Sequence, residues 1–477
     1  MIRRQESVPP ARATAGVAGD KAAADARSPA AIPPARPNGD AGRGVGDADT
    51  VWRATATNPA PPLAALDGDI ECDVAVIGAG FTGLSTAHHL LKAGVRPVVV
   101  IEARGLGFGA SGRTAGMAGT RYKHPFAAFA RRHGPAHALR LHAMAQEAID
   151  TLEGIVGEHR IPDAFSRYGQ LIPAHAAAPL AVLEEDVRWL AAEAGDGAPR
   201  ILTADETRRE TGSDAYVGAW FDPRGGAIHP LNYVHGLAAA LVRRGVPIHV
   251  ESPVTAVAEE PDAVVLTTPR GGRVQARQAV VATNAYTDMA LRLGDLHRRM
   301  VAVSASIVAT EPLSDDVAAG IMPGRRVASD TRRLLHAFRM LPDNRLLFAG
   351  RADITGRRAH DPASYAALEA AMAATFPQVE RSRVRHRWSG LVGMSADGLP
   401  HLGRLSPRVL YAVGFSGRGV TLTSLLGRYA ARMACGEAVD AGPITAGPFR
   451  PIPLHGLRVP MMRLVAAWYG LRDALAR

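Results

Sequence analysis

The sequence has few of the features that mark secreted or membrane-spanning proteins. Only two cysteines, Cys72 and Cys435, occur in 477 residues, too few for a disulfide framework, so a reducing, cytoplasmic compartment is expected. No apolar run reaches the roughly 18 residues that a membrane-spanning helix needs. The basic N-terminus is not followed by the apolar segment of a secretory signal. Membrane association is therefore not expected.

Lysine is nearly absent as well. Lys21, Lys92 and Lys123 are the three lysines, so the net charge of +10 comes almost entirely from arginine. The arginines are scattered, without a basic stripe, interleaved aromatic residues or a nucleic-acid motif, and nucleic acid is not expected as a partner. The histidines, among them His88 and His89, lack metal-ligand spacing, so no metal site is expected.

The remaining composition is that of a globular protein, with 47% hydrophobic residues and 49 glycines. The length suits one large domain or two interleaved domains. Residues 1–50 are rich in Ala, Pro, Gly, Arg and Asp and have no apolar periodicity, which predicts a disordered tail. From Val51 onward the chain is expected to fold.

Periodicity places strands and helices along this folded part. The stretch "CDVAVIGAG", a helix over about 82–93 ended by Gly94, and the run "RPVVVIEA" form a βαβ unit typical of a parallel sheet. Helices are expected within 125–158 and over 176–194, and strands within 252–288, 301–312 and 345–351. Pro342 and Asp343 predict a hairpin turn before the last of these. A strand, a glycine loop and a long helix follow over 409–436.

The βαβ unit carries a dinucleotide-binding pattern. Gly78, Gly80 and Gly83 form G-x-G-x-x-G, in which the glycines permit a tight turn, close approach of a pyrophosphate and close helix–strand packing. The helix N-terminus then offers free N–H groups to the phosphates. Glu102, nineteen residues after Gly83, ends the second strand, where a carboxylate can accept both ribose hydroxyls. The pattern predicts an ADP moiety but does not separate NAD from FAD.

Two further glycine loops favour FAD. The stretch "GFGASGRTAGMAG" over 107–119 is too rich in glycine and serine for an ordinary helix and would lay backbone N–H groups along a cofactor. The stretch "GFSGRGVTLTSLLG" over 414–427 places a second glycine loop before a helix. The N-terminus of that helix would face the flavin edge that carries negative charge when reduced.

These motifs, with "VVATNAYT" and "DGLPHLGR", resemble the D-amino-acid oxidase, glycine oxidase and sarcosine oxidase family of flavoproteins. Among its members the chain is most similar to those like γ-glutamylputrescine oxidoreductase. The resemblance covers about residues 51–477. It implies an α/β fold in which a Rossmann-type FAD-binding domain is interleaved with an α+β substrate domain that contains a mixed or antiparallel sheet.

The same resemblance implies a set of FAD-binding residues. They are Gly78, Ala79, Gly80, Phe81, Thr82 and Gly83 at the pyrophosphate; Glu102 and Ala103 at the ribose; Ser111, Arg113, Thr114, Ala115 and Gly116 at the flavin; Val254 at adenine; Ala282 and Thr283 at the end of a strand; and Gly414, Ser416, Gly417, Arg418, Gly419, Val420 and Thr421 at the pyrimidine edge. The relatives usually have histidine at the position of Arg418. Sarcosine oxidases attach flavin through a late cysteine, whereas Cys435 lies far along the last of these helices, so non-covalent FAD is expected.

Domain boundaries follow from the pattern and the resemblance together. The FAD-binding domain is expected over 51–125, 223–297 and 386–440, and the substrate domain over 126–222 and 298–385. Residues 441–477 form a C-terminal extension with an amphipathic, arginine-containing helix. We expect this helix to pack on its own domain rather than on a membrane surface. The sequence does not indicate an oligomeric state.

Catalytic residues are less clearly marked, because flavin oxidation of a neutral amine needs positioning more than a protein base. The candidates are Lys123, His229, Tyr286 and Arg351. Lys123, with His124 beside it, follows the flavin loop; His229 starts a helix near the domain junction; Tyr286 follows "VATN". Arg351 could hold a substrate carboxylate, as could Arg332 and Arg333. For each of these residues the alternative is an ordinary surface or packing role. Trp388 is expected to pack near the flavin and Asp397 to end a turn.

The resulting hypothesis is an FAD-dependent oxidoreductase acting on CH–NH or CH–NH2 donors. It would oxidise the C–N bond of a small amine or amino acid, with γ-glutamylated polyamines among the candidates, to an imine. Oxygen would be the acceptor, giving hydrogen peroxide. A dehydrogenase that passes electrons to a quinone or partner protein is the alternative. A non-catalytic flavin-binding protein and an NAD-only dehydrogenase are two further ones.

Overall fold

The structure is a computed structural model of the chain and describes residues 48–475 except 290 and 292. The tail expected over 1–50 therefore lies outside the described residues, apart from its last three. Helix α1 (Val51–Thr55) begins directly after Thr50, whose hydroxyl accepts a hydrogen bond from the Arg53 N–H at 3.3 Å. This cap satisfies a backbone donor that the first helical turn leaves free.

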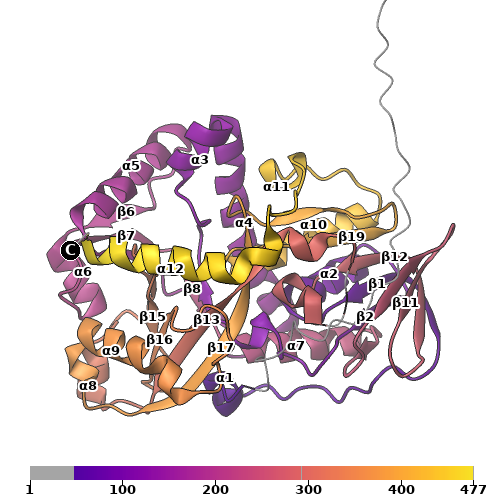
Figure 1. Cartoon of the computed structure of the whole chain (residues 1–477), viewed down its shortest axis with the longest axis horizontal. Coiled ribbons are helices and arrows are strands. Elements are labelled where there is room, and N and C mark those ends of the chain that lie inside the picture. The colour runs from indigo at the N-terminus through magenta and orange to yellow at the C-terminus, as the bar shows by residue number, and fades with distance from the viewer. Residues whose placement is uncertain (1–47, 290, 292, 476–477) are drawn as a thin grey trace, which may run out of the picture. The chain divides into compact units, whose positions relative to one another are not determined.

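Sheet A has eight strands in the order β10-β11-β12-β1-β2-β9, with β19 paired to β12 and β18 paired to β19 (Figure 1). Its strands are β1 (Ile70–Ile77), β2 (Val98–Ile101), β9 (Ile248–His249), β10 (Ala256–Glu259), β11 (Val264–Thr267), β12 (Arg273–Val281), β18 (His401–Arg404) and β19 (Val409–Val413). The pairs of β1 with β2 and β12, β2 with β9, and β12 with β19 are parallel. The predicted parallel βαβ unit is confirmed.

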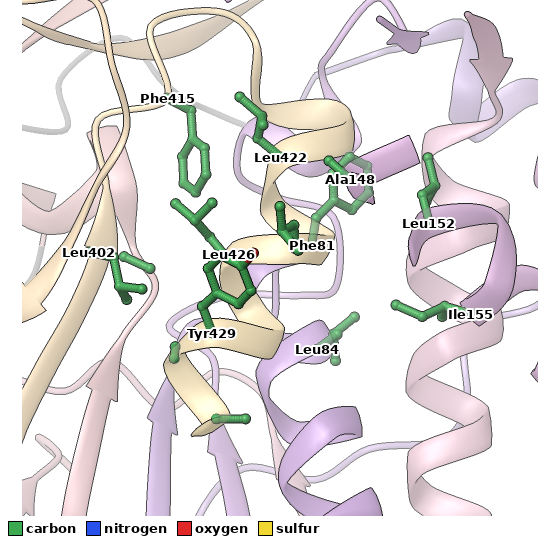
Figure 2. Packing of buried hydrophobic residues seen from close by; sticks show 14 of the residues in the cluster. Phe81, Leu84, Ala148, Leu152, Ile155, Leu402, Phe415, Leu422, Leu426 and Tyr429 are labelled. Carbon is green, nitrogen blue, oxygen red and sulfur yellow. The ribbon is translucent and has the colours of Figure 1, made fainter. Parts of the chain in front are cut away.

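Helices α2 (Phe81–Lys92), α4 (Pro135–His159) and α10 (Gly419–Ala434) share one core with β18 (Figure 2). Helices α2 and α10 approach closely, because a Cβ on Gly427 would lie 2.6 Å from the Cβ of Ser85. At this crossing the Ser85 hydroxyl donates to the Ser424 carbonyl at 2.7 Å. The packing fixes the N-termini of two helices from distant parts of the sequence relative to each other.

Sheet C has eight strands in the order β17-β13-β16-β15-β14-β5-β7-β6. They are β5 (Gln170–Ala174), β6 (Arg200–Leu202), β7 (Gly218–Asp222), β13 (Met300–Thr310), β14 (Val327–Ser329), β15 (Ala337–Met340), β16 (Leu346–Gly350) and β17 (Val384–Ser395). The pair β14–β5 is parallel and the others are antiparallel. The hairpin predicted at Pro342 and Asp343 joins β15 to β16. The predicted α/β fold with a mixed second sheet is confirmed.

A small third sheet and further helices complete the described part. The sheet has the order β3-β8-β4 and consists of β3 (Met117–Ala118), β4 (Phe165–Ser166) and β8 (Gly226–Ile228). The helices are α3 (Phe126–His133), α5 (Ala177–Glu193), α6 (Ala204–Thr211), α7 (Pro230–Arg243), α8 (Asp315–Ala319), α9 (Ala366–Thr375), α11 (Pro443–Ala446) and α12 (Arg458–Leu475). The helical stretch expected within 125–158 is two helices, separated at Gly134 with a φ of +89°. The domain boundaries given above stay predictions.

Candidate active site

A cavity of about 930 Å³ lies between the N-termini of α2 and α10 on one side and sheet C on the other. Strands β13, β14, β16 and β17 contribute lining residues, as do the segment 110–125 and helices α5 and α12. The volume is at the upper end of the range for small-molecule and cofactor sites. The sequence-predicted residues that line it are Gly80, Phe81, Thr82, Ser111, Arg113, Thr114, Ala115, Lys123, Ala282, Arg332, Arg333, Arg351, Ser416, Gly417, Arg418, Gly419 and Val420.

The first glycine turn places an uncapped helix end at this cavity. Gly78 has a φ of +104°, and a Cβ on Gly83 would lie 1.8 Å from the Gly78 carbonyl oxygen, so both positions require glycine. Gly80, the residue before α2, provides no side-chain cap. The Phe81 N–H donates instead to the Ser111 hydroxyl at 2.9 Å. Free N–H groups at a helix N-terminus fit an anionic group such as a pyrophosphate.

Glu102 lies beside this turn, as the dinucleotide pattern requires. Its carboxylate accepts hydrogen bonds from the Ala79 N–H at 2.8 Å and from the Arg104 N–H at 3.0 Å. Burial raises the pKa of this carboxyl above its usual value. The hydrogen bonds from the Ala79 and Arg104 N–H groups act in the opposite direction but are the smaller effect. Ala103, Val254 and Thr283, also predicted to bind the nucleotide, are not among the residues that line the cavity.

The segment predicted to follow the flavin forms no α-helix beyond a short 3-10 turn over Ala110–Gly112. Arg113 anchors it, because Nε donates to the Phe108 carbonyl at 2.6 Å and Nη1 to the Ser389 carbonyl at 3.1 Å. Arg339, which the sequence did not single out, donates to the carbonyl of Gly116 at 2.6 Å. Two buried arginines therefore hold this loop in place, one of them from β15.

The second glycine loop begins after β19. Gly414 donates its N–H to the Asn284 side chain at 2.9 Å, and Ser416 and Gly417 have φ values of +52° and +84°. The loop ends at Arg418, which precedes α10 without a side-chain cap. Thr421, in the first turn of α10, donates its hydroxyl to the Gly119 carbonyl at 2.9 Å and is not among the residues that line the cavity. A second uncapped helix N-terminus thus meets the cavity.

Several cationic side chains of the described residues line the cavity without forming an ion pair to a carboxylate; Lys123, Arg351 and Arg418 are among them, as is Arg458 of α12. Within the described part of the chain, Lys123, Arg351 and Arg418 form no ion pair; Arg351 donates to the Ser304 carbonyl at 3.5 Å. Lys123 is accessible to solvent, yet burial of its ammonium, with Arg351 and Arg418 nearby, lowers its pKa from the ordinary value. Burial and the neighbouring Arg121 lower the pKa of Arg418 to about 10. The uncompensated positive charge favours an anionic ligand.

Arg121, Arg332 and Arg333 also line the cavity, and each is already paired with a carboxylate. Arg332 forms an ion pair with Asp330, and Arg333 lies 3.5 Å from the carboxylate of Asp473. Arg121, which the sequence did not mark, forms a buried ion pair with Asp186 at 2.6 Å. In the sequence, the one sign that Arg121 lies at the cavity was its position two residues before Lys123. Neither Arg332 nor Arg333 has the free guanidinium that a substrate clamp needs.

Two of the catalytic candidates lie outside the cavity lining. His229 is the N-cap of α7: its Nδ1 accepts from the Asn232 N–H at 3.1 Å, so Nε2 carries the proton and donates to the Thr55 hydroxyl at 3.1 Å. The Tyr286 hydroxyl accepts from the Leu391 N–H at 3.1 Å. His124, beside Lys123, is likewise not a lining residue. These catalytic assignments stay predictions.

The placement of Trp388 near the flavin stays a prediction, whereas Asp397 ends a turn as expected. Trp388 is buried and its indole Nε1 donates to the Arg113 carbonyl at 2.8 Å, in the segment predicted to follow the flavin. Asp397 ends a turn by accepting from the Leu399 N–H at 3.1 Å, and it accepts from His401 at the same distance.

One group of described residues could hold a metal ion. The ligand atoms of His88, Glu158 and His159 lie within 4.8 Å of one another, although the sequence spacing gave no sign of this. The group is internally bonded, because His88 Nδ1 and His159 Nε2 are 3.0 Å apart and Lys92 donates to Glu158 at 2.8 Å. The hydrogen bond between the two histidines engages one ring nitrogen of each, and Lys92 already balances the Glu158 charge.

Comparisons with known proteins agree with the geometry. A family model described as FAD-dependent oxidoreductase matches residues 73–433. The chain is 36% identical to the γ-glutamylputrescine oxidoreductase of Escherichia coli K12 over 431 residues, which cover 89% of this chain and 98% of the relative. It is 34% identical to the probable oxidoreductase OrdL of Haemophilus influenzae, covering 79% and 85%. The glycine oxidase structure from Geobacillus kaustophilus superposes with a TM-score of 0.65 at 21% identity, covering 79% and 99%.

Proposed function

The chain belongs to the D-amino-acid oxidase family of FAD-dependent oxidoreductases, which act on CH–NH or CH–NH2 donors, and we propose that its own substrate is a small amine that carries a carboxylate. The main observation in support of this proposal is that Lys123, Arg351 and Arg418 line the cavity without a carboxylate partner among the described residues. A bound carboxylate would supply the missing negative charge.

The residues around the cavity fit FAD. The uncapped N-termini of α2 and α10 suit the pyrophosphate and the flavin, and Glu102 suits the ribose. FAD, when bound, accepts two electrons from the carbon next to the amine nitrogen. We propose that it binds without a covalent link, since Cys72 is buried in β1 and Cys435 follows α10, and neither lines the cavity.

Within this site the protein residues orient the substrate. Arg351 offers a planar pair of donors to a carboxylate, and Lys123 adds a second charge beside it. The apolar walls, among them Ile172 and Val303, exclude water from the remainder of the ligand. Holding the amine end against the cofactor in this way is the main catalytic contribution that the reaction asks of the protein.

The relative at 36% identity suggests a γ-glutamylated polyamine as one candidate within this class. Such a compound carries a carboxylate at its glutamyl end and an oxidisable amine at the other. A free amino acid has both groups on one carbon. Comparing the two compounds with matched amines that lack the carboxylate tests the proposed class directly.

The decisive experiment mixes the FAD-loaded protein anaerobically with this panel and follows bleaching of the flavin absorbance. We expect bleaching by carboxylate-bearing amines and much slower bleaching by their decarboxylated analogues. Bleaching by neither group would favour a non-catalytic flavin-binding protein. Equal bleaching by both would refute the role of the carboxylate while leaving amine oxidation in place.

We further propose that oxygen is the electron acceptor and hydrogen peroxide the second product. Measured peroxide should then equal the substrate consumed in air. Turnover that needs an added dye or quinone, with little peroxide, would instead support a dehydrogenase that passes electrons to a quinone or partner protein. The visible absorption spectrum of the purified protein distinguishes the oxidase and the flavin-containing dehydrogenase from an NAD-only dehydrogenase. Bound flavin makes a protein yellow, whereas bound NAD does not.

A further inference from the structure

Helix α12 exposes an unusual amount of apolar surface. Ten large hydrophobic side chains are exposed in the described part of the chain, and eight of them lie between Leu454 and Leu471. Four of these eight line the cavity, whereas Leu457, Leu464, Trp468 and Leu471 do not. Leu464 is 73% exposed, and Trp468 and Leu471 are each 53% exposed. Because soluble surfaces rarely gather such residues in one place, this segment marks an interaction site.

Three exposed residues of α12 that do not line the cavity form one face of the helix. Leu464, Trp468 and Leu471 follow at spacings of four and three, which places them on the same side. Met462 and Ala466 lie on the opposite side and line the cavity. Figure 1 shows α12 in yellow as one continuous helix leading to the C-terminus. The helix therefore covers the cavity with one face and presents a second apolar face outward.

The charges on the helix are arranged around this outward face. Arg463 and Arg472 lie on its two flanks, about 90° from its centre at 100° per residue. Arg472 also lies over the Trp468 ring, with 5.7 Å between its guanidinium carbon and the ring centroid. Asp473 is the one acidic residue in α12, and its carboxylate accepts hydrogen bonds from the N–H groups of Arg333 and Leu334 at 3.1 and 3.0 Å. No carboxylate is left on α12 to balance the flanking arginines.

In contrast to the sequence-based expectation that this helix packs on its own domain and not on a membrane, we propose that α12 docks the protein on an anionic lipid bilayer. Leu464, Trp468 and Leu471 enter the boundary between headgroups and acyl chains, and Arg463 and Arg472 contact the lipid phosphates. An apolar helix face with aromatic and arginine residues is the pattern of helices that lie in this interface. A second copy of the chain fits less well, because a symmetric pairing of this face would bring arginines together without acidic partners.

The proposal differs from insertion across the bilayer and goes beyond the proposed reaction. None of the described helices combines the length and apolarity needed to cross a membrane. Docking through the outward face would leave the inner face of α12 in place over the cavity. The cavity would then lie about one helix diameter, roughly 10 Å, from the lipid.

The test uses the full-length, FAD-loaded protein and vesicles of phosphatidylcholine with or without phosphatidylglycerol. We expect co-sedimentation with the anionic vesicles and a blue shift of tryptophan emission. The shift would report on Trp468, since Trp52, Trp220 and Trp388 are buried and Trp189 is partly buried. Trp468→Phe should remove the shift while the protein still sediments with the vesicles.

Variants separate the apolar contribution from the charge. Leu464→Glu should weaken binding roughly tenfold or more, because it removes the burial of a leucine side chain. Arg463→Gln and Arg472→Gln should each weaken it about fivefold. Arg277→Gln, on an exposed side chain of β12, changes the charge as much as Leu464→Glu does and should leave binding unchanged.

Three results would overturn the proposal. Equal binding to neutral and anionic vesicles would refute the anionic partner. Anionic binding that Leu464→Glu leaves unchanged would mean that the overall positive charge binds the vesicles without α12. Absence of vesicle binding together with a dimer that Leu464→Glu dissociates would identify a second copy as the partner. Each is independent of whether the amine panel bleaches the flavin.

Discussion

The indole Nε1 of Trp388 donates a hydrogen bond to the backbone carbonyl of Arg113 at 2.8 Å. Trp388 belongs to β17 in sheet C, and Arg113 belongs to the loop that follows β2 of sheet A. A second hydrogen bond joins the same two segments, because the Arg113 guanidinium donates to the Ser389 carbonyl at 3.1 Å. Two reciprocal bonds therefore fix the predicted flavin loop against the sheet that lines the cavity.

Replacing Trp388 with phenylalanine should destabilise the protein and loosen its hold on FAD. The change keeps an aromatic ring but leaves the Arg113 carbonyl without its donor, at a cost of about 1–3 kcal/mol. The free energy of unfolding in urea and the FAD content after dialysis measure the two effects. Trp468→Phe is the matched control, because that side chain is 53% exposed and should change stability by less than about 0.5 kcal/mol. Equal effects of the two variants would contradict the prediction.

Replacing Arg351 with methionine should impair the enzyme toward carboxylate-bearing amines. A charge-assisted hydrogen bond contributes about 1.5–3 kcal/mol, so kcat/KM should fall by roughly 10- to 150-fold. For an amine without the carboxylate, kcat/KM should fall much less, because neither the wild-type protein nor the variant can form this hydrogen bond with it. Arg383→Met, on an exposed side chain, controls for a general effect of removing arginine. A similar loss for both substrates would show that Arg351 acts on something other than the carboxylate.

The elements that the sequence predicted are those set by local patterns. The turn from Gly78 to Gly83 and the hairpin at Pro342 depend on backbone conformations that few residues besides glycine and proline favour. The same holds for the start of α7 at His229, where proline follows directly. Such features can be identified from neighbouring residues alone.

The parts that escaped prediction depend on contacts between distant segments. Arg332 was a candidate clamp, but Asp330 neutralises it across a tight turn. Arg339 reaches Gly116 from more than two hundred residues away. That α12 lines the cavity could not be inferred either, since amphipathicity indicates that a helix packs on a surface without showing which one. Tertiary packing decides these cases.

His229 should make stability depend on pH in mildly acidic solution. Burial, with Arg339 nearby, lowers its pKa from 6.5 to about 4. The unfolded chain therefore takes up a proton below about pH 6.5 that the folded chain binds only below about pH 4. Stability from this group is complete above pH 6.5 and falls as the pH drops to 4, by up to about 3 kcal/mol.

His229→Asn tests this prediction, because asparagine also caps helices but does not titrate. The variant should lose part of the decline in the free energy of unfolding between pH 6.5 and 4, whereas His360→Asn, at an exposed position, should keep it. If His229→Asn keeps the same pH profile, His229 is not the source of the decline in the free energy of unfolding. The capping role also predicts an unchanged kcat, so a large loss of kcat with normal stability would support the catalytic assignment instead.

Replacing Gly427 with alanine should destabilise the crossing of α2 and α10. The added Cβ would lie 2.6 Å from both the Cβ and the hydroxyl oxygen of Ser85 and 2.9 Å from the Thr86 nitrogen, so the helices must separate. Overpacking of this kind costs about 1–3 kcal/mol. Gly154→Ala in α4 is the matched control, since nothing lies within 4 Å of its added Cβ and alanine favours a helix by about 1 kcal/mol. Thermal unfolding of the two variants should therefore shift in opposite directions.

Because both helix N-termini line the cavity, Gly427→Ala should also weaken FAD binding. If Gly427→Ala leaves both the stability and the FAD content unchanged, the crossing of α2 and α10 tolerates the added methyl group.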